Sequence, residues 1–285
     1  MKVVLPERNP FKKREIVVYV LILLVCIISI IIAFYVQFYA RIDVGRMLGF
    51  NTEVEFGNKT EEETELLKVE FDQIFTNSIE NGEVQENKKK ESDKPLVYTK
   101  TEKKESKLNS YDIEVHIPYI NIDNEKIEEY NKEIEDFVDK TNSVLESQNR
   151  NTIYTVEYVA NVHDDILSLM IRSNLKEGSS AQRVIIQTYN YDLRNNKEIT
   201  LEEVLKIKNV NLSEVQEKIK KEINVEQKKV EDLKNLGYNI YSRDVASDIY
   251  EIENSKEFYL TNDTLYIIYA YGNETFTSEM DLIVI

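Results

Sequence analysis

An uncharged, almost wholly apolar run from Ile16 to Val36 follows directly on a cationic Lys-Lys-Arg cluster at positions 12–14. About 20 apolar residues span the hydrocarbon core of a bilayer. Phe38 and Tyr39 extend the run with aromatic side chains, which are enriched at membrane interfaces. The run therefore predicts a single transmembrane helix over residues 16–39.

A cleaved secretory signal is the alternative for this segment, and it would have a shorter apolar core and small residues at its exit. The exit here reads Phe38, Tyr39, Ala40, and the large side chain two places before Ala40 favours an uncleaved signal-anchor. Residues 1–15 contain five Lys or Arg, and basic flanks stay on the cytoplasmic side. We therefore expect a single-pass protein of the cell membrane, with a cytoplasmic tail over residues 1–15 and the rest outside.

The chain beyond this tail is strongly acidic. Residues 1–15 hold five of the 36 Lys and Arg and two of the 52 Asp and Glu, which leaves 31 against 50, a formal charge of about −19. Nucleic acid is excluded as a partner, because phosphate binding needs clustered Lys and Arg. The acidic excess is typical of a soluble surface near an anionic envelope, and the alternative is attraction of a cationic partner.

The only cysteine, Cys26, lies inside the apolar run. The exported part therefore has no disulfide and no cysteine nucleophile, and its stability must come from packing. Abundant Lys, Glu, Asn and Ile without Trp indicate an AT-rich bacterial genome. A disulfide-free exported domain also suits a Gram-positive bacterium, which has one membrane.

Two segments precede the expected folded domain. Residues 40–80 are predicted to form a juxtamembrane stalk, because Thr60 and Glu63 have the spacing of a capping box and apolar residues recur at helical spacing up to Ile79. Such a stripe packs on another helix or on its own copy, so we expect self-association through the stalk. The charged stretch 81–109 has few apolar residues and is predicted to be a linker.

Residues 110–285 are predicted to form an α+β domain, in which antiparallel sheets are packed with amphipathic helices. Period-two alternation predicts its strands, and apolar stripes of helical period predict its helices. In residues 166–175 the alternation predicts a half-buried antiparallel strand. The expected elements are strands over 111–119, 152–162, 166–175, 183–192, 257–261, 264–270 and 279–285, and helices opened by Asp123 or Asn124, by Thr200 with Glu203, and by Ser213 with Gln216.

Several segments have a more specific pattern. They are Val115–Ile120 with the helix from Asn124, Ile166–Ile171, Tyr189–Leu205, and Phe258–Leu265. With the order of elements, they make residues 111–285 resemble the extracytoplasmic domain of the RsiV-like lysozyme-sensing anti-sigma factors and the non-catalytic region of membrane-anchored peptidoglycan deacetylases. The resemblance implies an outward-facing binding or sensing domain.

The chain departs from that family in two places. Between the second and third strands of the meander, family members commonly have a Gly-rich segment with a histidine, whereas this chain has Gly178 followed by Ser, Ser and Ala. The resemblance therefore implies no function for this loop of the chain. The tail over residues 1–15 is also too short for a sigma-binding domain.

One cluster has residue types that suit metal chemistry, namely His163, Asp164 and Asp165. It falls at a predicted turn between strands, where Asp is favoured for its own backbone hydrogen bonds.

His116 alternates opposite to apolar neighbours, which indicates a solvated strand face. The carboxylates at 128–136 are read as the solvated face of a helix, because glycoside hydrolysis needs two carboxyls that converge on one cleft. No P-loop, G-x-G-x-x-G, H-E-x-x-H or G-x-S-x-G occurs. The sequence predicts no enzyme, no metal site and no cofactor.

Tyrosines crowd the last part of the chain, and Tyr266, Tyr269 and Tyr271 are the candidate partner-binding residues. Such a cluster suits a protein contact or stacking on sugar rings, and the alternative is that the rings belong to a core that lacks Trp. We expect a binding or sensing domain at the bacterial surface, for a cationic protein such as lysozyme or for peptidoglycan. The alternatives are an accessory to, or remnant of, a peptidoglycan-modifying enzyme and a structural envelope subunit.

Overall fold

The computed structural model describes residues 59–75, 89–146 and 151–285, all within a compact unit that runs from Glu55 to Ile285. The predicted cytoplasmic tail, transmembrane segment and final turns of the stalk helix lie outside these residues. None of the helices in the described ranges has the length and apolar character needed to cross a bilayer.

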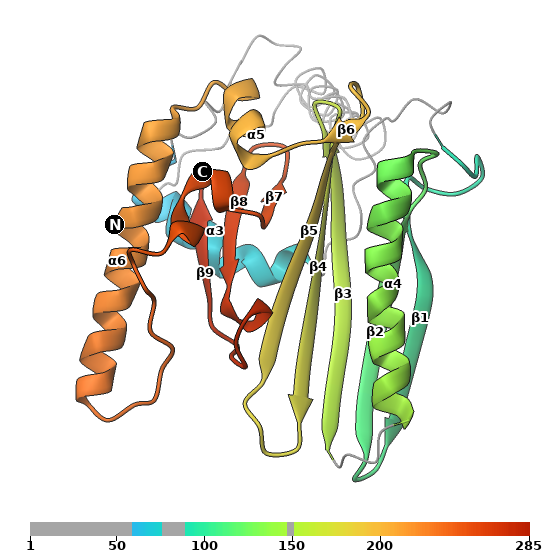
Figure 1. The fold of residues 1–285 in the computed structure, drawn as a ribbon, viewed down its shortest axis with the longest axis horizontal. Helices are drawn as coiled ribbons and strands as arrows, with labels where there is room; N and C mark the ends of the chain where they lie inside the picture. The colour runs from blue at the N-terminus through green and yellow to red at the C-terminus, as the bar shows by residue number, and fades with distance from the viewer. Residues whose placement is uncertain (1–58, 76–88, 147–150) are drawn as a thin grey trace, which may run out of the picture. The chain divides into compact units, whose positions relative to one another are not determined.

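Nine strands form two sheets within the described residues (Figure 1). The larger sheet has the order β1-β2-β3-β4-β5-β6, and the smaller sheet has the order β7-β8-β9. The described fold is therefore α+β, as expected. The strands are β1 Val97–Lys107, β2 Tyr111–Ile120, β3 Thr152–His163, β4 Ile166–Glu177, β5 Arg183–Asp192, β6 Lys197–Glu198, β7 Phe258–Leu260, β8 Leu265–Ala270 and β9 Met280–Val284.

Two long helices and two shorter ones are described with these strands: α3 Glu61–Ile74, α4 Glu125–Glu146, α5 Leu201–Ile207 and α6 Leu212–Asn235. The predicted capping boxes of Thr60 with Glu63 and of Thr200 with Glu203 are confirmed. The third helix start is a correction, since Asn211 rather than Ser213 caps α6. The Asn211 side chain accepts from the Ser213 N–H, so Ser213 lies within the first turn of the helix.

The pairing of β2 with β3 is parallel, which corrects the expectation of wholly antiparallel sheets. Helix α4 is the connection between them. A helix of 22 residues and a strand of 10 residues are both about 33 Å long, so α4 returns the chain to the end where β2 began. Antiparallel strands need no such crossover, and the other neighbouring pairs in both sheets are antiparallel.

The predicted linker over residues 81–109 is wrong for its last part, because β1 occupies Val97–Lys107 and pairs with β2 along its length. Most β1 side chains are exposed, and many are Lys or Glu. Natural edge strands carry such charges, which discourage pairing with other chains. Composition alone therefore makes an edge strand look like a linker.

Helix α3 is not a free stalk over its described residues, because it packs on the domain itself. Phe71 is 1 % exposed, and its ring lies 5.4 Å from the ring of Tyr266 in β8. Lys68 forms an ion pair of 2.5 Å with Glu222 of α6. The described members of the apolar stripe that predicted self-association, Leu67, Phe71, Ile74 and Phe75, thus pack on the same chain.

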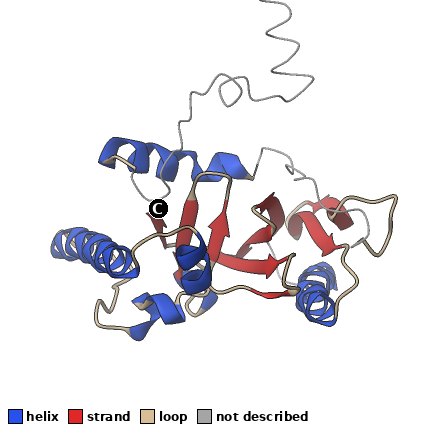
Figure 2. Ribbon diagram, turned by 90° about the horizontal axis from the view of Figure 1, so that it is seen from above, coloured by secondary structure: helices blue, strands red, loops and turns tan. Residues whose placement is uncertain are grey.

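Three apolar clusters hold these layers together. The first lies between α4 and one face of the larger sheet, the second between the smaller sheet and α5 with α6, and the third between the two sheets, with Phe71. Helices accordingly flank the strands on several sides (Figure 2). Strand β4 is buried on both faces, with Leu169 in the first cluster and Met170 in the third, so the prediction of a half-buried strand is corrected. The second sheet covers the face that was expected to be solvated.

Candidate functional site

The three predicted contact tyrosines are buried. Tyr266, Tyr269 and Tyr271 are 3 %, 7 % and 5 % exposed. The Tyr269 hydroxyl lies 2.8 Å from Ser255 Oγ, and burial raises the pKa of Tyr266 to about 12. In this arrangement the rings are parts of the second and third apolar clusters, and they present no open face to a partner.

The predicted turn at the histidine and two aspartates is confirmed. Asp164 and Asp165 join β3 to β4 with positive φ values of 51° and 62°. Lys208 Nζ lies 2.6 Å from Asp164, and this hydrogen bond holds the pKa of Asp164 below its usual range. Arg194 pairs with Asp165 at 2.5 Å. The two carboxylates are thus engaged in ion pairs between loops, and the described residues contain no group of three or more metal-ligating side chains. His116 is partly exposed on β2, 4.0 Å from a Glu102 oxygen.

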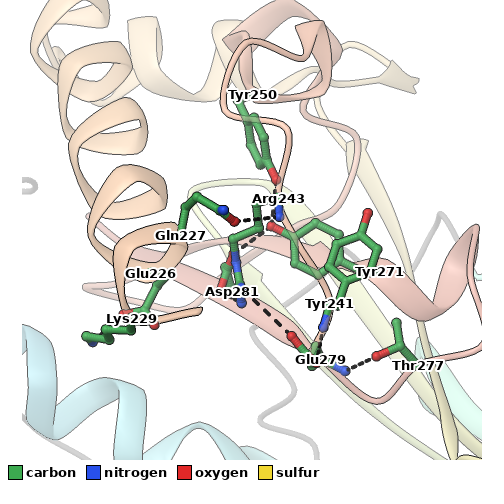
Figure 3. Close-up of polar contacts among 10 residues, drawn as sticks. All are labelled: Glu226, Gln227, Lys229, Tyr241, Arg243, Tyr250, Tyr271, Thr277, Glu279 and Asp281. Atoms are coloured by element: carbon green, nitrogen blue, oxygen red, sulfur yellow. Dashed lines mark hydrogen bonds and ion pairs between the residues drawn. The ribbon is translucent and has the colours of Figure 1, made fainter. Parts of the chain in front are cut away.

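A buried polar cluster, which we call the Arg243 cluster, lies where the loop after α6 meets the smaller sheet (Figure 3). Arg243 donates to both carboxylate oxygens of Asp281 in β9, at 2.5 and 2.7 Å. The Tyr271 hydroxyl donates to the same carboxylate at 2.5 Å, and the Tyr250 hydroxyl is 2.7 Å from that of Tyr271. The Tyr241 ring stacks on Tyr271 with centroids 4.5 Å apart.

The electrostatics of the Arg243 cluster favour a fixed, charged pair. Burial opposes the charge of Arg243, but the hydrogen bonds to Asp281, together with the negative charges of Asp281 and Glu279 and the contribution of Tyr271, outweigh it and raise the Arg243 pKa. Burial and then Asp281 raise the pKa of Tyr271. On the helix side, Gln227 Oε1 accepts from the Arg243 backbone N–H at 2.8 Å. The cluster therefore bonds the loop to both α6 and β9, and its role is to stabilise the fold.

The sequence contains no pattern that predicts the Arg243 cluster. Arg243 and Asp281 are 38 positions apart, and nothing in their local patterns marks them as partners. Alternation does place Asp281 within a strand, but an aspartate in a strand near an apolar end is most simply taken as solvent-facing.

The outer face of α4 has a different character, because it is exposed and acidic. The helix contains eight Asp or Glu and three Lys, and all eight carboxylates are exposed. Three of them pair with lysines, as Glu128 does with Lys90 at 2.5 Å. The other five have no cation within 4.0 Å among the residues that the structure describes. They are Glu125, Glu133, Asp136, Asp139 and Glu146. We call this surface the α4 acidic face.

A hollow of about 260 Å³ lies between α4 and strands β1 and β2, beside this face. Its walls include Tyr119, Glu135, Val138 and Asp139. Lys100 also lines the hollow, with its Nζ 4.7 Å from the centroid of the Tyr119 ring and 3.2 Å from Glu135, so the protein's own cation occupies this wall. Aromatic surface beside carboxylates is chemically suited to a Lys or Arg side chain.

A second hollow, of about 310 Å³, contains Glu257 at the edge of β5. The Glu257 carboxylate accepts from the Thr188 backbone N–H at 2.7 Å, in place of a neighbouring strand. Burial raises the Glu257 pKa to about 7. This carboxyl therefore titrates near neutral pH at the joint between the two sheets.

No protein-family model matches the sequence, and no curated protein matches it. Among the solved structures that match, two are similar in part. A DUF3298 family protein from Pseudomonas aeruginosa PAO1 has a TM-score of 0.38 and 13 % identity, over 67 % of this chain and 90 % of that one. A member of the DUF3298 family from Bacteroides fragilis NCTC 9343 has a TM-score of 0.31 and 13 % identity, over 61 % and 80 % of the two chains.

Proposed function

We propose that the domain is an extracytoplasmic binding or sensing module for a cationic protein, and that the α4 acidic face is its contact surface. The proposed transmembrane segment holds it in the cell membrane with the N-terminus in the cytoplasm. The protein acts by binding, without catalysis of its own. The resemblance noted in the sequence makes lysozyme the natural first probe.

The observation that carries this proposal is the set of five α4 carboxylates without a cation within 4.0 Å in the described part of the chain. Exposed like charges on one helix repel one another, and this repulsion lowers the stability of the fold. Solubility or the attraction of an oppositely charged partner is what such charges provide in return. The helix is also a rigid support, because its inner residues Ile127 and Ile134 are 0 % and 1 % exposed. Carboxylates on such a support keep a fixed pattern, which favours complementary charge on a partner.

The hollow beside the face supplies the second requirement of a contact. Binding energy concentrates where a side chain enters a desolvated pocket, while surrounding charges mainly set the rate and selectivity of association. A Lys or Arg of the partner that enters beside Asp139 meets a carboxylate that has no cation within 4.0 Å among the described residues, while Lys100 stays with Glu135 and the Tyr119 ring. The face then steers the partner, and the hollow holds one of its side chains.

The test is titration calorimetry of residues 55–285 with lysozyme at low ionic strength. A fragment that starts at Ser110 is unsuitable, because it lacks α3 and β1, which belong to the fold. The first variant carries Glu125→Gln, Glu133→Gln, Asp136→Asn and Asp139→Asn. Its matched control carries four amide substitutions on exposed α6 carboxylates, at Glu214, Glu217, Glu231 and Asp232.

Both variants lose four negative charges, so they separate the place of the charge from its amount. We expect the α4 variant to bind lysozyme at least about tenfold more weakly, or about 1.4 kcal/mol, and the control to stay within about threefold of wild type. Equal weakening in both would show an effect of net charge alone. A folded wild-type fragment that binds no lysozyme would remove the proposal, and turnover of peptidoglycan by that fragment would favour the enzyme-accessory alternative.

A further inference from the structure

The hollow of about 310 Å³ beside Glu257 contains a largely desolvated carboxylate that has no cation within 4.0 Å among the described residues. Its volume is at the lower end of the range of small-ligand sites. Apolar side chains form part of its lining, such as Ile268 and Ala270, which are 2 % and 8 % exposed. Glu257 itself keeps partial exposure, so its side chain can be reached from solvent. We call this space the Glu257 hollow.

The fold fixes the position of this carboxylate. The Ile268 N–H donates to the Glu257 carbonyl at 2.9 Å, and the Thr188 N–H donates to the carboxylate Oε2 at 2.7 Å. Within the described ranges, Thr188 of β5 is the one residue that donates hydrogen bonds to this carboxylate. A carboxylate has about four acceptor positions, so part of its capacity is unused.

The neutral polar side chains of the lining are engaged elsewhere. The Asn273 amide donates to the Ile186 carbonyl at 2.9 Å and accepts from the Ile186 N–H at 3.1 Å. The Asn254 amide donates to the Asp248 carbonyl at 3.0 Å. These amides hold loops and the edge of β5 in place, and neither of them bonds to Glu257 in the described structure.

The lining has an excess of negative charge. It contains Asp248, Glu257 and Glu274 against Lys256 alone. Asp248 and Glu274 are exposed, and neither has a cation within 4.0 Å in the described part of the chain. Lys256 is also exposed, and its charge is the weakest of the influences that act on the Glu257 pKa. The protein's own lysine therefore does not neutralise the buried carboxylate.

Burial raises the Glu257 pKa to about 7, although the hydrogen bonds from Thr188 lower it. The other titratable groups near this carboxylate are Tyr189 of β5, Tyr269 of β8 and Tyr271 just after β8, and burial raises their pKa values, so they are neutral at this pH. An opposite charge within about 4–6 Å of a carboxylate makes its ionised form about tenfold to a thousandfold more favourable. By linkage, a cation in the hollow binds the ionised form of Glu257 more tightly by the same factor.

We infer that the Glu257 hollow is a binding site for a small organic cation, one that carries a primary ammonium or a guanidinium group. Such a group donates strong hydrogen bonds to a single carboxylate. A metal ion fits less well, because the described residues contain no group of three or more metal-ligating side chains. The cation donates to Glu257, and Asp248 and Glu274 attract it from the rim. This site is separate from the α4 acidic face and would exist whether or not that face binds a protein.

The test uses the full-length protein in neutral detergent at about pH 8, titrated in separate experiments with butylamine, with methylguanidine and with uncharged butanol, at matched ionic strength. We expect one cation to bind with a dissociation constant of about 1 mM or tighter. Binding of only butylamine identifies an ammonium ligand, and binding of only methylguanidine a guanidinium ligand. Binding of neither cation overturns the inference, and so does binding of butanol as tightly as butylamine.

Variants locate the site. Glu257→Gln should weaken binding at least about tenfold. The matched control Glu253→Gln loses the same charge from an exposed residue outside the hollow and should leave binding unchanged. Similar weakening in both variants would mean attraction by net charge and would contradict the assignment. If Glu257→Gln fails to fold, Asp248→Asn takes its place; unchanged binding in that variant would contradict the location.

Proton release gives an independent readout. Wild-type affinity should weaken about fivefold to tenfold between about pH 8 and about pH 6, because Glu257 takes up a proton as the pH falls through about 7. Near pH 6.5, binding should release about half a proton or more, seen as a heat that depends on the ionisation enthalpy of the buffer. Glu257→Gln should abolish both effects. Binding of the cation without proton release in wild type would contradict a role for Glu257.

Discussion

Helices α4 and α6 have nearly the same length, 22 and 24 residues, and each buries one apolar stripe on its own sheet. Their outer faces differ. Helix α6 has six acidic and six basic residues, whereas α4 has eight acidic residues and three lysines. Helix α6 thus packs on its sheet and keeps a polar outer face with equal numbers of acidic and basic residues. The excess on α4 is not something that a helix in this fold requires, and this is why we connect it with a partner.

The two helices also differ in how polar groups tie them down. The α6 side contains the Arg243 cluster, with Arg243 8 % and Asp281 6 % exposed. The α4 side is joined to its sheet mainly through apolar contacts and by neutral hydrogen bonds, such as those of the buried Asn131 to the Ile120 backbone at 2.8 and 2.9 Å. The α6 side should therefore be sensitive to the loss of one charge, and the α4 side should not.

The largest expected effect comes from Asp281→Asn. Removal of one partner from a buried ion pair leaves the other charge uncompensated, which costs about 3–5 kcal/mol. The control Asp165→Asn breaks the exposed pair with Arg194 and should cost less than about 1 kcal/mol. Urea unfolding of both variants gives the two free energies of unfolding.

Hydrogen exchange then localises the damage. Asp281→Asn should accelerate exchange in β9 and α6 more than in β2 and α4. Equal acceleration in both regions would show that the Arg243 cluster supports the whole domain and that the contrast between the two helices is not one of local stability.

The next effect concerns Glu257, at the joint between the sheets. Its pKa is raised to about 7 in the folded protein, so the fold favours the protonated form. Its contribution to stability is therefore fully present below the ordinary carboxyl pKa of about 4.5, and it is lost as the pH rises through 7. The expected loss is at most about 3 kcal/mol.

Glu257→Gln keeps an oxygen that accepts from the Thr188 N–H but does not titrate. This variant should flatten the pH dependence of unfolding free energy between pH about 5 and about 8, and it should exceed wild type in stability at the upper end. An unchanged pH dependence in the variant would assign the effect to other groups.

The smallest effects are those of the helix caps. Asn124 Oδ1 accepts from the Lys126 N–H at 2.9 Å at the start of α4, and Asn211 caps α6 in the same way. Asn124→Ala and Asn211→Ala should each cost about 1 kcal/mol in urea unfolding. A much larger loss for Asn211→Ala alone would mean that Asn211 does more than cap α6.

Local patterns predicted much of the fold. The capping boxes, the turn at Asp164 and Asp165, and the strands of the meander follow from rules that act over a few residues, and the structure confirms them. Long-range features were not predictable in this way. Strand β1 was hidden by its charges, and the parallel pairing of β2 with β3 depends on the path of α4.

The same division holds for the candidate sites. The acidic residues of α4 are visible in the sequence, but their lack of ion pairs depends on which lysines of distant segments reach them, as Lys90 and Lys100 do. The tyrosines near the end of the chain were equally visible. Whether Tyr266 faces a partner or Phe71 depends on where α3 packs, and no pattern near Tyr266 reports that.

The central claim is that the α4 acidic face attracts a cationic partner, and its most direct test is the association rate constant with lysozyme as ionic strength is varied. Exposed charges act over about 10 Å at 0.1 M salt, so steering by the face should make association fall steeply as salt is added. We predict a steep dependence for wild type and for the four-fold α6 control, and a much shallower one for the four-fold α4 variant. The same steep dependence in all three proteins would contradict the account.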